Sequence, residues 1–315
     1  MPTVLGAATV DGVSLTTGAT YVLNPVTGEI VEFSNFQQSG APAKCGMILP
    51  NKNIASGRIY RMKPGTSTVG PEVNAIPSGS SNLYNLLAVG GLGESTRAAG
   101  IEQAGFTVEG TQQGHSYGGL KVRYSLAAYI HDLIVKGIPG TSSTPPGETF
   151  SLELWHADGG AIVEDVFVDG MDIAATLFGL NTCSDVTVRS CIASRTKVGF
   201  GIAIWQCANV LIQDFDSHRC HRAINIEQPQ SPHTLEQCDV RGTNRPHITC
   251  NSTERSIPLK VIDPAWDTGT QLRIGVSSQP YFGKPQLQKI SDVQVIKGGV
   301  DISKDTSKVL IGDVW

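Results

Sequence analysis

The sequence has few charged residues, few aromatic residues and no long apolar run, and each shortage excludes a class of protein. Charged residues make up 17% of the 315-residue chain and aromatic residues 6%. A long coiled coil needs many more charged helix formers, so that class is excluded. No apolar stretch approaches the roughly 18 residues of a membrane-spanning helix, and we expect no membrane insertion. The formal net charge of −4 does not favour nucleic acid as a partner.

The sequence also lacks the patterns of a disulfide framework, a zinc site and a secretion signal. Its seven cysteines are odd in number and include no Cys-x-x-Cys pair. His218, Cys220 and His221 carry metal-capable atoms, but zinc needs three or four converging ligands and no second pair follows. We therefore expect no metal and no cofactor. The N-terminus has no basic region followed by an apolar core, so no classical secretion signal is visible.

Glycine, proline and apolar residues are plentiful instead. The chain contains 35 glycines and 17 prolines, and 40% of its residues are apolar. It is too apolar for a disordered chain. The composition predicts an all-β protein with many turns.

An internal repeat dominates the sequence from about residue 105 onward. Five eight-residue segments align without gaps at 130–137, 163–170, 188–195, 212–219 and 235–242. Apolar and polar residues alternate within each segment, as in a β-strand. A row of bends is expected at the third positions, which are Asp132, Asp165, Ser190, Asp214 and Gln237. The segment at 290–297 aligns with 163–170 and places Asp292 in this row, and the closing 309–314 aligns with 210–215.

A second strand recurs between these copies. Its inward positions are Val122, Leu154, Leu180, Ile204 and Ile226, and the same spacing continues the row to Ile248. A unit of about 22–25 residues with two or three strands cannot bury its apolar face alone, so it must stack on its neighbours as a solenoid. A leucine-rich repeat would show a Leu-rich consensus and a helical leg, and a propeller blade would need about 40–50 residues.

The repeat resembles the parallel β-helix of the pectin-lyase-like superfamily over roughly residues 105–313. The resemblance implies a right-handed coil, with about 22–25 residues per turn. We expect an irregular N-terminal β region at 1–104, with early coils and a cap or docking segment, and a regular β-helix at 105–257. An excursion loop or side subdomain is expected at 258–289, and the final coils at 290–315.

One outward row of the second strand is the candidate binding face. It contains Arg123, Trp155, Asn181, Trp205 and Glu227, each of which follows an inward residue. Tryptophan rings can stack on pyranose faces while neighbouring amides and carboxylates bind hydroxyl groups. The predicted glycan-binding residues are Trp155, Trp205, His156, Gln206 and Asn225. The alternative is that the tryptophans pack under a neighbouring loop or in a subunit interface.

Catalytic residues are much harder to identify. The first carboxylates to consider are Glu153, Asp214 and Glu227, although an aspartate at a bend also stabilises the backbone. The catalytic motifs of the superfamily are not present. Residues 213–216 (QDFD) and 218–221 (HRCH) are the nearest approach to an Asp-Asp pair and a Gly-His-Gly.

The resemblance and the lack of a secretion signal together favour a virion protein. Such β-helices occur in phage tailspikes and minor tail proteins, which reach the cell exterior without export. We expect a virion tail component, a homotrimer that contacts other tail subunits and attaches to host surface polysaccharide or builds the tail tip. The alternatives are a polysaccharide depolymerase on the same scaffold and an extracellular bacterial adhesin.

Overall fold

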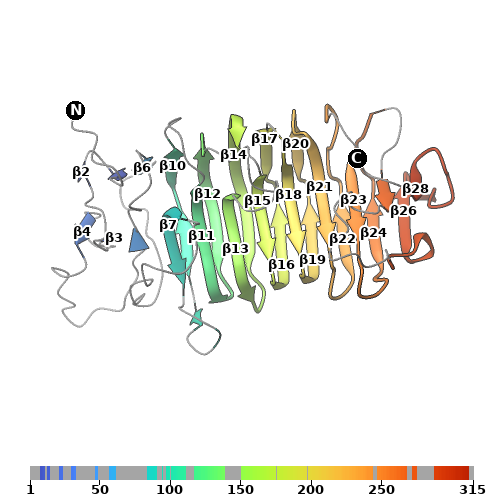
Figure 1. The fold of residues 1–315 in the computed structure, drawn as a ribbon, viewed down its shortest axis with the longest axis horizontal. Helices are drawn as coiled ribbons and strands as arrows, with labels where there is room; N and C mark the ends of the chain where they lie inside the picture. Colours follow the sequence, from blue (N-terminus) through green and yellow to red (C-terminus); the bar gives the residue numbers. More distant parts are fainter. Residues whose placement is uncertain are drawn as a thin grey trace.

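The computed structural model is a rod of stacked parallel strands, a β-solenoid (Figure 1). Strands form nearly all of its regular structure, and one 3₁₀ turn, η4 (Ile290–Asp292), lies near the C-terminal end. The structure describes residues 8–10, 13–14, 21–23, 30–32, 47–48, 57–61, 84–90, 94, 97–99, 101–110, 117–138, 150–174, 176–196, 198–243, 247–267, 272–274 and 287–311. The prediction of an all-β stacked solenoid is therefore confirmed.

Two long sheets run along the rod. Within the described residues, the first sheet has 15 strands. Its order is β2 (Val13–Ser14), β1 (Ala8–Val10), β6 (Gly57–Arg61), β10 (Phe106–Gly110), β12 (Tyr129–Lys136), β14 (Ile162–Ala174), β16 (Ser184–Arg189), β19 (Ala208–Gln213), β22 (His233–Glu236), β24 (Leu259–Ile262), β26 (Val293–Lys297) and β27 (Val300–Asp301). Three further strands pair with members of this row, namely β9 (Glu102–Ala104), β17 (Ile192–Thr196) and β20 (Asp216–His218).

The second sheet has 10 strands in the same described residues. Its order is β28 (Val309–Ile311), β25 (Leu272–Ile274), β23 (Ile248–Asn251), β21 (Arg222–Glu227), β18 (Phe200–Trp205), β15 (Thr176–Asn181), β13 (Phe150–Asp158), β11 (Tyr117–Leu126) and β7 (Tyr84–Gly90), with β8 (Ala98–Ala99) paired to β11. A small separate sheet joins β4 (Ile30–Glu32), β3 (Tyr21–Leu23) and β5 (Met47–Ile48). None of the helices in the described part of the chain is long and apolar enough to cross a bilayer.

Equivalent apolar residues lie directly above one another, as the repeat predicts. Val163 pairs in register with Val188, and Val188 pairs with Ile212. All three side chains are fully buried, whereas the polar residue that follows each is not. Each parallel strand of a stack is called a rung below, and neighbouring rungs are about 4.8 Å apart. Burial of these apolar rows between the two sheets forms one continuous core.

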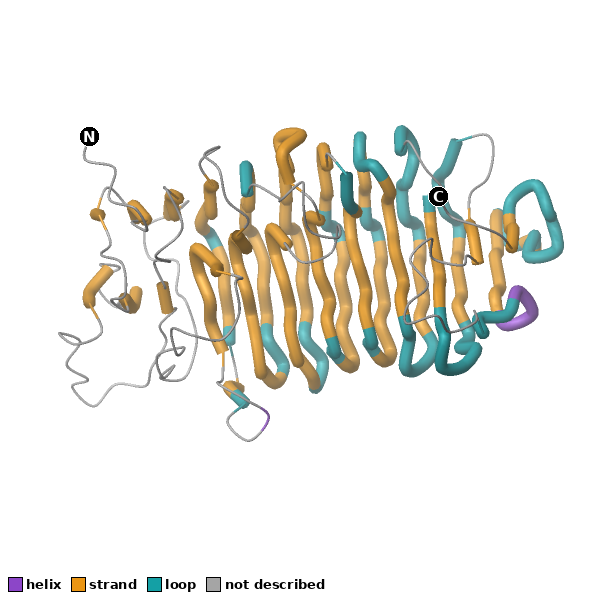
Figure 2. Tube along the Cα trace, in the orientation of Figure 1, coloured by secondary structure: helices purple, strands orange, loops and turns teal. Residues whose placement is uncertain are grey.

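The rungs turn at corners where single residues adopt the left-handed backbone conformation. The five predicted bend residues have φ between 48° and 53°, which confirms the bend row. A second corner row contains Tyr124, His156, Thr182, Gln206 and Gln228. The N–H of a corner residue donates to the next rung, as from Asp214 to the carbonyl of Glu236 at 3.1 Å. Figure 2 shows strand and loop segments recurring at the same levels along the rod.

Buried cysteines form ladders inside the core. The thiols of Cys183 and Cys207 each accept an N–H from the preceding rung, at 3.4 Å in both cases. The six cysteines in the described residues are buried and form no disulfide. Burial raises the pKa of Cys191 to about 12. Such thiols act as small apolar side chains and not as nucleophiles.

The stacking is more regular after residue 257 than the sequence predicts, although the rows there are shifted. Within the segment expected to be an excursion loop or side subdomain, β24 continues the first sheet and β25 continues the second. Cys250, and not Ile248, pairs with Ile226, because the preceding connection is two residues longer than the spacing implies. The domain boundaries themselves stay a prediction.

The last coil also departs from the predicted alignment. Val295 occupies the row of Val163, whereas Asp292 lies in η4, since a 3₁₀ turn precedes the strand. The segment that begins at Val309 pairs with β25 in the second sheet, and not with the first sheet. Residues 312–315 lie outside the described residues.

An antiparallel hairpin closes the C-terminal end of the first sheet. The strand β27 folds back on β26 through Gly298 and Gly299, which have φ of 56° and 79°. The N–H of Ile302 donates to the carbonyl of Val295 at 2.8 Å. Sequence inspection missed this cap, although a Gly-Gly pair between two short strands is a known signal for a hairpin turn.

Candidate functional site

The predicted outward residues form one continuous row on the second sheet. Register pairing joins Arg123 on β11 to Trp155, Asn181, Trp205 and Glu227 on the next four rungs. We call these five residues the outer row. Each is half-buried. The two tryptophans are two rungs apart, about 10 Å along the rod, so both indoles can contact one extended ligand.

Two of the predicted site residues beside this row are buried instead of exposed. Glu153 is 6% exposed and forms an ion pair with Lys121, with 2.8 Å between Oε2 and Nζ. Asn225 is 4% exposed, donates to Oε1 of Glu227 at 2.9 Å and accepts from Thr249 at 2.5 Å. Their polar atoms are engaged within the protein. Neighbouring side chains enclose both residues, so neither presents a free polar group to a ligand.

Side-chain packing holds Trp155 in place. The Nζ of Lys121 lies 4.0 Å from the centroid of its ring. The ring of Tyr124 is tilted against it at 5.5 Å and stacks on His156 at 4.9 Å. The Lys121 ammonium is therefore shared between the indole and Glu153. This packing supports part of the alternative interpretation, in which the tryptophan is an element of the protein's own structure.

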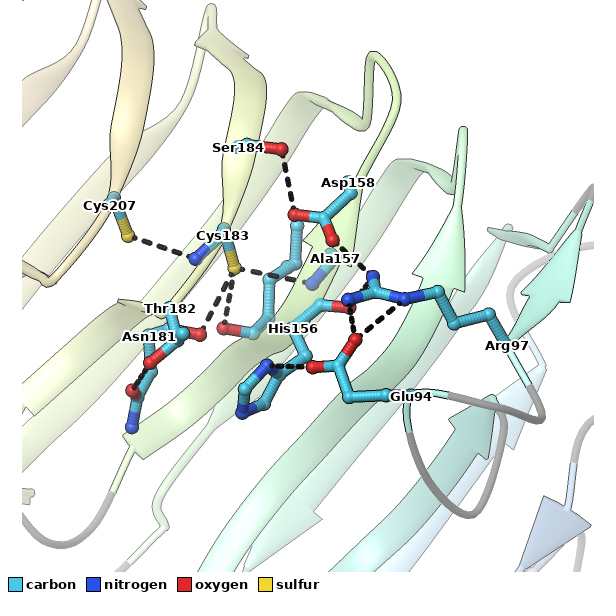
Figure 3. A network of polar contacts seen from close by, with 11 residues as sticks. Glu94, Arg97, His156, Ala157, Asp158, Asn181, Thr182, Cys183, Ser184 and Cys207 are labelled. Atoms are coloured by element: carbon cyan, nitrogen blue, oxygen red, sulfur yellow. Dashed lines mark hydrogen bonds and ion pairs between the residues drawn. The ribbon is translucent and has the colours of Figure 1, made fainter. Parts of the chain in front are cut away.

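His156 and Gln206 lie at the corner, where their backbones have φ of 52° and 51°. His156 is held by a segment that sequence reasoning missed (Figure 3). Its Nδ1 lies 2.7 Å from Oε1 of Glu94, and its carbonyl accepts from Nη1 of Arg97 at 2.9 Å. Arg97 also pairs with Glu94 and Asp158. Glu94 and Arg97 belong to no repeat unit, so no periodic signal could have identified them.

The three predicted catalytic carboxylates are not brought together. Glu153 and Glu227 are three rungs apart on the second sheet, about 14 Å along the rod. Paired carboxylates of glycosidases are about 5–10 Å apart. Asp214 is exposed at a corner of the first sheet. These residues do not form a common acid–base site.

Two other aspartates lie on neighbouring rungs. Asp216, in β20 of the first sheet, is the bridge partner of Asp239. Nε2 of His218 lies 2.7 Å from Oδ2 of Asp216, and Nε of Arg241 donates to Oδ1 of Asp239 at 2.9 Å. Burial raises the pKa of Asp216, whereas the hydrogen bond from Arg241 lowers the pKa of Asp239. The bend at Asp214 led sequence reasoning away from Asp216, and its partner in the next repeat was not considered.

Within the described residues, no group of three or more His, Cys, Asp or Glu side chains is placed to hold a metal ion. The fold and the outer row define the class of the protein as a parallel β-solenoid with a half-buried, tryptophan-bearing polar row on one sheet. Comparisons with protein families, curated proteins and solved structures found no match for the chain.

Proposed function

We propose that the protein is a glycan-attachment component of a phage tail, of the tailspike or minor tail type. The observation that carries the proposal is the alignment of Trp155 and Trp205 in one row with polar neighbours along a rigid stack. Rings and amides at a fixed spacing suit an extended sugar chain. The resemblance to the pectin-lyase-like β-helix supports the virion setting, a homotrimeric assembly and contacts with other tail subunits.

Glycan attachment is tested by binding of the purified chain to host surface polysaccharide. Trp155→Ala and Trp205→Ala should each weaken binding roughly fivefold or more, because stacking is lost. Trp266→Ala is the matched control, since Trp266 is half-buried against the hydrophobic core and is not in the outer row. Unchanged binding in both row variants would remove the proposed site.

The virion setting needs separate measurements. Mass spectrometry of purified phage particles should detect the chain, and a neighbourhood of tail genes should surround its gene. Sedimentation equilibrium should give the mass of a trimer. Two results together would favour the bacterial adhesin instead. The purified protein would be a monomer at all concentrations, and no phage genes would lie near its gene.

Polysaccharide cleavage is a second candidate function, and the Asp216–Asp239 pair favours it. Carboxylates whose pKa values are moved in opposite directions can act as general acid and base. If the chain releases reducing ends from a polysaccharide, Asp216→Asn and Asp239→Asn should abolish release. Asp214→Asn should leave it unchanged. Full activity in both of the first two variants would exclude this pair.

A further inference from the structure

Arg123 is a half-buried arginine of the second sheet that forms no ion pair with a carboxylate of the described residues. Arg97, Arg189, Arg195 and Arg241 each pair with a carboxylate. The Nε of Arg123 is buried and has no hydrogen-bond partner, and no carboxylate of the described residues forms an ion pair with its guanidinium. Burial lowers the pKa of Arg123. A desolvated charge without a partner costs stability, so its retention calls for an explanation.

The neighbours of Arg123 leave this charge uncompensated but reachable. On one side its register partner is Gly90, which has no side chain to cover it, and on the other side it is Trp155. Glu153, the acid on the same face of β13, already pairs with Lys121. The two cations and one anion leave a net positive charge here. Because Arg123 is half-buried and not enclosed, a ligand can reach it from the outer face.

Asn181 and Trp205 of the outer row also carry donor groups. The side-chain oxygen of Asn181 accepts from Thr182 at 2.9 Å, which leaves its amide nitrogen as the outward donor. The indole nitrogen of Trp205 is buried and has no partner. Glu227 at the other end of the row is an acceptor. A ligand that lies along the part of the row from Arg123 to Trp205 must therefore supply acceptors. The rung spacing of about 4.8 Å is close to the length of one hexose in an extended chain.

We propose that Arg123 binds the anionic substituent of an acidic polysaccharide whose chain runs along the outer row past Trp155. A planar guanidinium can donate two parallel hydrogen bonds to a carboxylate, sulfate or phosphate group, and it is more weakly hydrated than an ammonium. The substituent would supply the missing counter-ion, while the indole contacts the sugar ring. This inference rests on the proposed glycan attachment and specifies in addition that the bound glycan is anionic.

The direct test titrates the protein with glucuronate, glucose 6-sulfate and glucose while the Nε–H NMR signal of Arg123 is followed. An acidic sugar should shift the signal in the millimolar range, and glucose should not. The preferred acidic sugar separates a carboxylate from a sulfate ligand. Arg123→Gln should weaken binding of that sugar about tenfold or more, because a charge-assisted hydrogen bond is lost. Arg189→Gln on the first sheet is the matched control and should bind as the wild type does.

Arg123→Lys is a control for loss of folding, because it keeps the positive charge but lacks the planar guanidinium group. This variant should bind the acidic sugar with an affinity between those of the wild type and Arg123→Gln. Arg123→Gln itself should unfold at no lower denaturant concentration than the wild type, since no internal partner is lost. If inorganic sulfate shifts the signal as strongly as the sugars do, Arg123 is a site for an adventitious ion only. If Arg123→Gln changes the sedimentation of the protein and not sugar binding, the counter-ion comes from a second copy of the chain. Either result overturns the proposal.

Polysaccharide binding separates this inference from the function on which it rests. If Trp155→Ala weakens binding to host polysaccharide and Arg123→Gln does not, glycan attachment stands and the acidic ligand is wrong. If Trp155→Ala, Trp205→Ala and Arg123→Gln all leave binding unchanged, both fail.

Discussion

Single residues show how tightly the outer face of the second sheet is packed. Gly179 lies in the row of Glu153 and Ala203, and a methyl group there would lie 2.6 Å from Cγ of Phe150. Gly179→Ala should therefore destabilise the protein by about 1–3 kcal/mol, as overpacking does. Urea unfolding measures the loss. In a Phe150→Ala background the same change should cost much less, and an equal cost in both backgrounds would contradict the contact.

His233 is a buried residue that makes stability depend on pH. It is 2% exposed, its Nδ1 accepts the N–H of Val210 at 3.2 Å, and burial lowers its pKa to about 4. Between pH 6.5 and 4, His233 is protonated in the unfolded chain but stays neutral in the folded protein. Stability should therefore fall as the pH drops from 6.5 to 4, by about 3 kcal/mol from this group.

The variant His233→Gln isolates that contribution, because an amide oxygen can still accept from Val210. Its free energy of unfolding should depend less on pH between 6.5 and 4 than that of the wild type. His131 is the control with opposite sign. Burial lowers its pKa, but hydrogen bonds with Asp132 and Glu102 outweigh this and raise it. Its contribution is present below about pH 6.5 and is lost as the pH rises above that value. His131→Gln should therefore leave the decline between pH 6.5 and 4 unchanged and should reduce the loss of stability above pH 6.5.

At the scale of the element, the predicted bend positions coincide with the corner residues that have a left-handed backbone conformation. Ser190 has φ of 51° and is exposed, so its side chain makes little packing contribution. Left-handed backbone costs a non-glycine residue about 1–2 kcal/mol. Ser190→Gly should raise the free energy of unfolding, and Ser190→Val should lower it, by amounts within that range. Thermal unfolding measures both, and an equal effect of the two substitutions would contradict the left-handed corner.

The repeating elements were predictable because one physical pattern recurs in each of them. Alternating burial fixed the row of Val163, Val188 and Ile212, and small or polar residues marked the corners. The predicted register was wrong where the connections between strands changed length, as at Ile248. A constant spacing between repeats does not account for residues added in a loop. Asp292 was misplaced for a related reason, since a 3₁₀ turn before the strand shifts the rows by several residues.

The candidate site was predictable only as far as it follows the repeat. Its alignment follows from spacing, so Trp155 and Trp205 fall in one row as expected. The burial of a side chain and the identity of its interaction partners do not follow from the spacing of the repeats. The pairing of Glu153 with Lys121 and the isolation of Arg123 depend on which side chains meet across rungs, and the hold of Glu94 on His156 depends on a segment outside the repeat.

At the scale of the whole molecule, the last described rung of the first sheet carries an antiparallel hairpin. The hairpin of β26 and β27 covers the edge of the first sheet, and its turn depends on the left-handed backbone of Gly299. Val293 and Val295 lie on the strand that it covers. Exposed edges of β-rich strands pair with other chains. The hairpin therefore keeps the end of the first sheet from stacking on another rod.

Gly299→Val should open this edge. No atom lies within 4 Å of the added Cβ, so the substitution acts through the backbone, at a cost of about 1–2 kcal/mol. Sedimentation velocity should show larger species that increase with protein concentration, relative to the wild type. Gly160→Val is the matched control, because Gly160 has φ of 89° and equal open space but lies in the turn between β13 and β14. Both variants should lose similar stability, and only Gly299→Val should associate. Association of both variants to the same extent would mean that the hairpin does not protect the end of the rod.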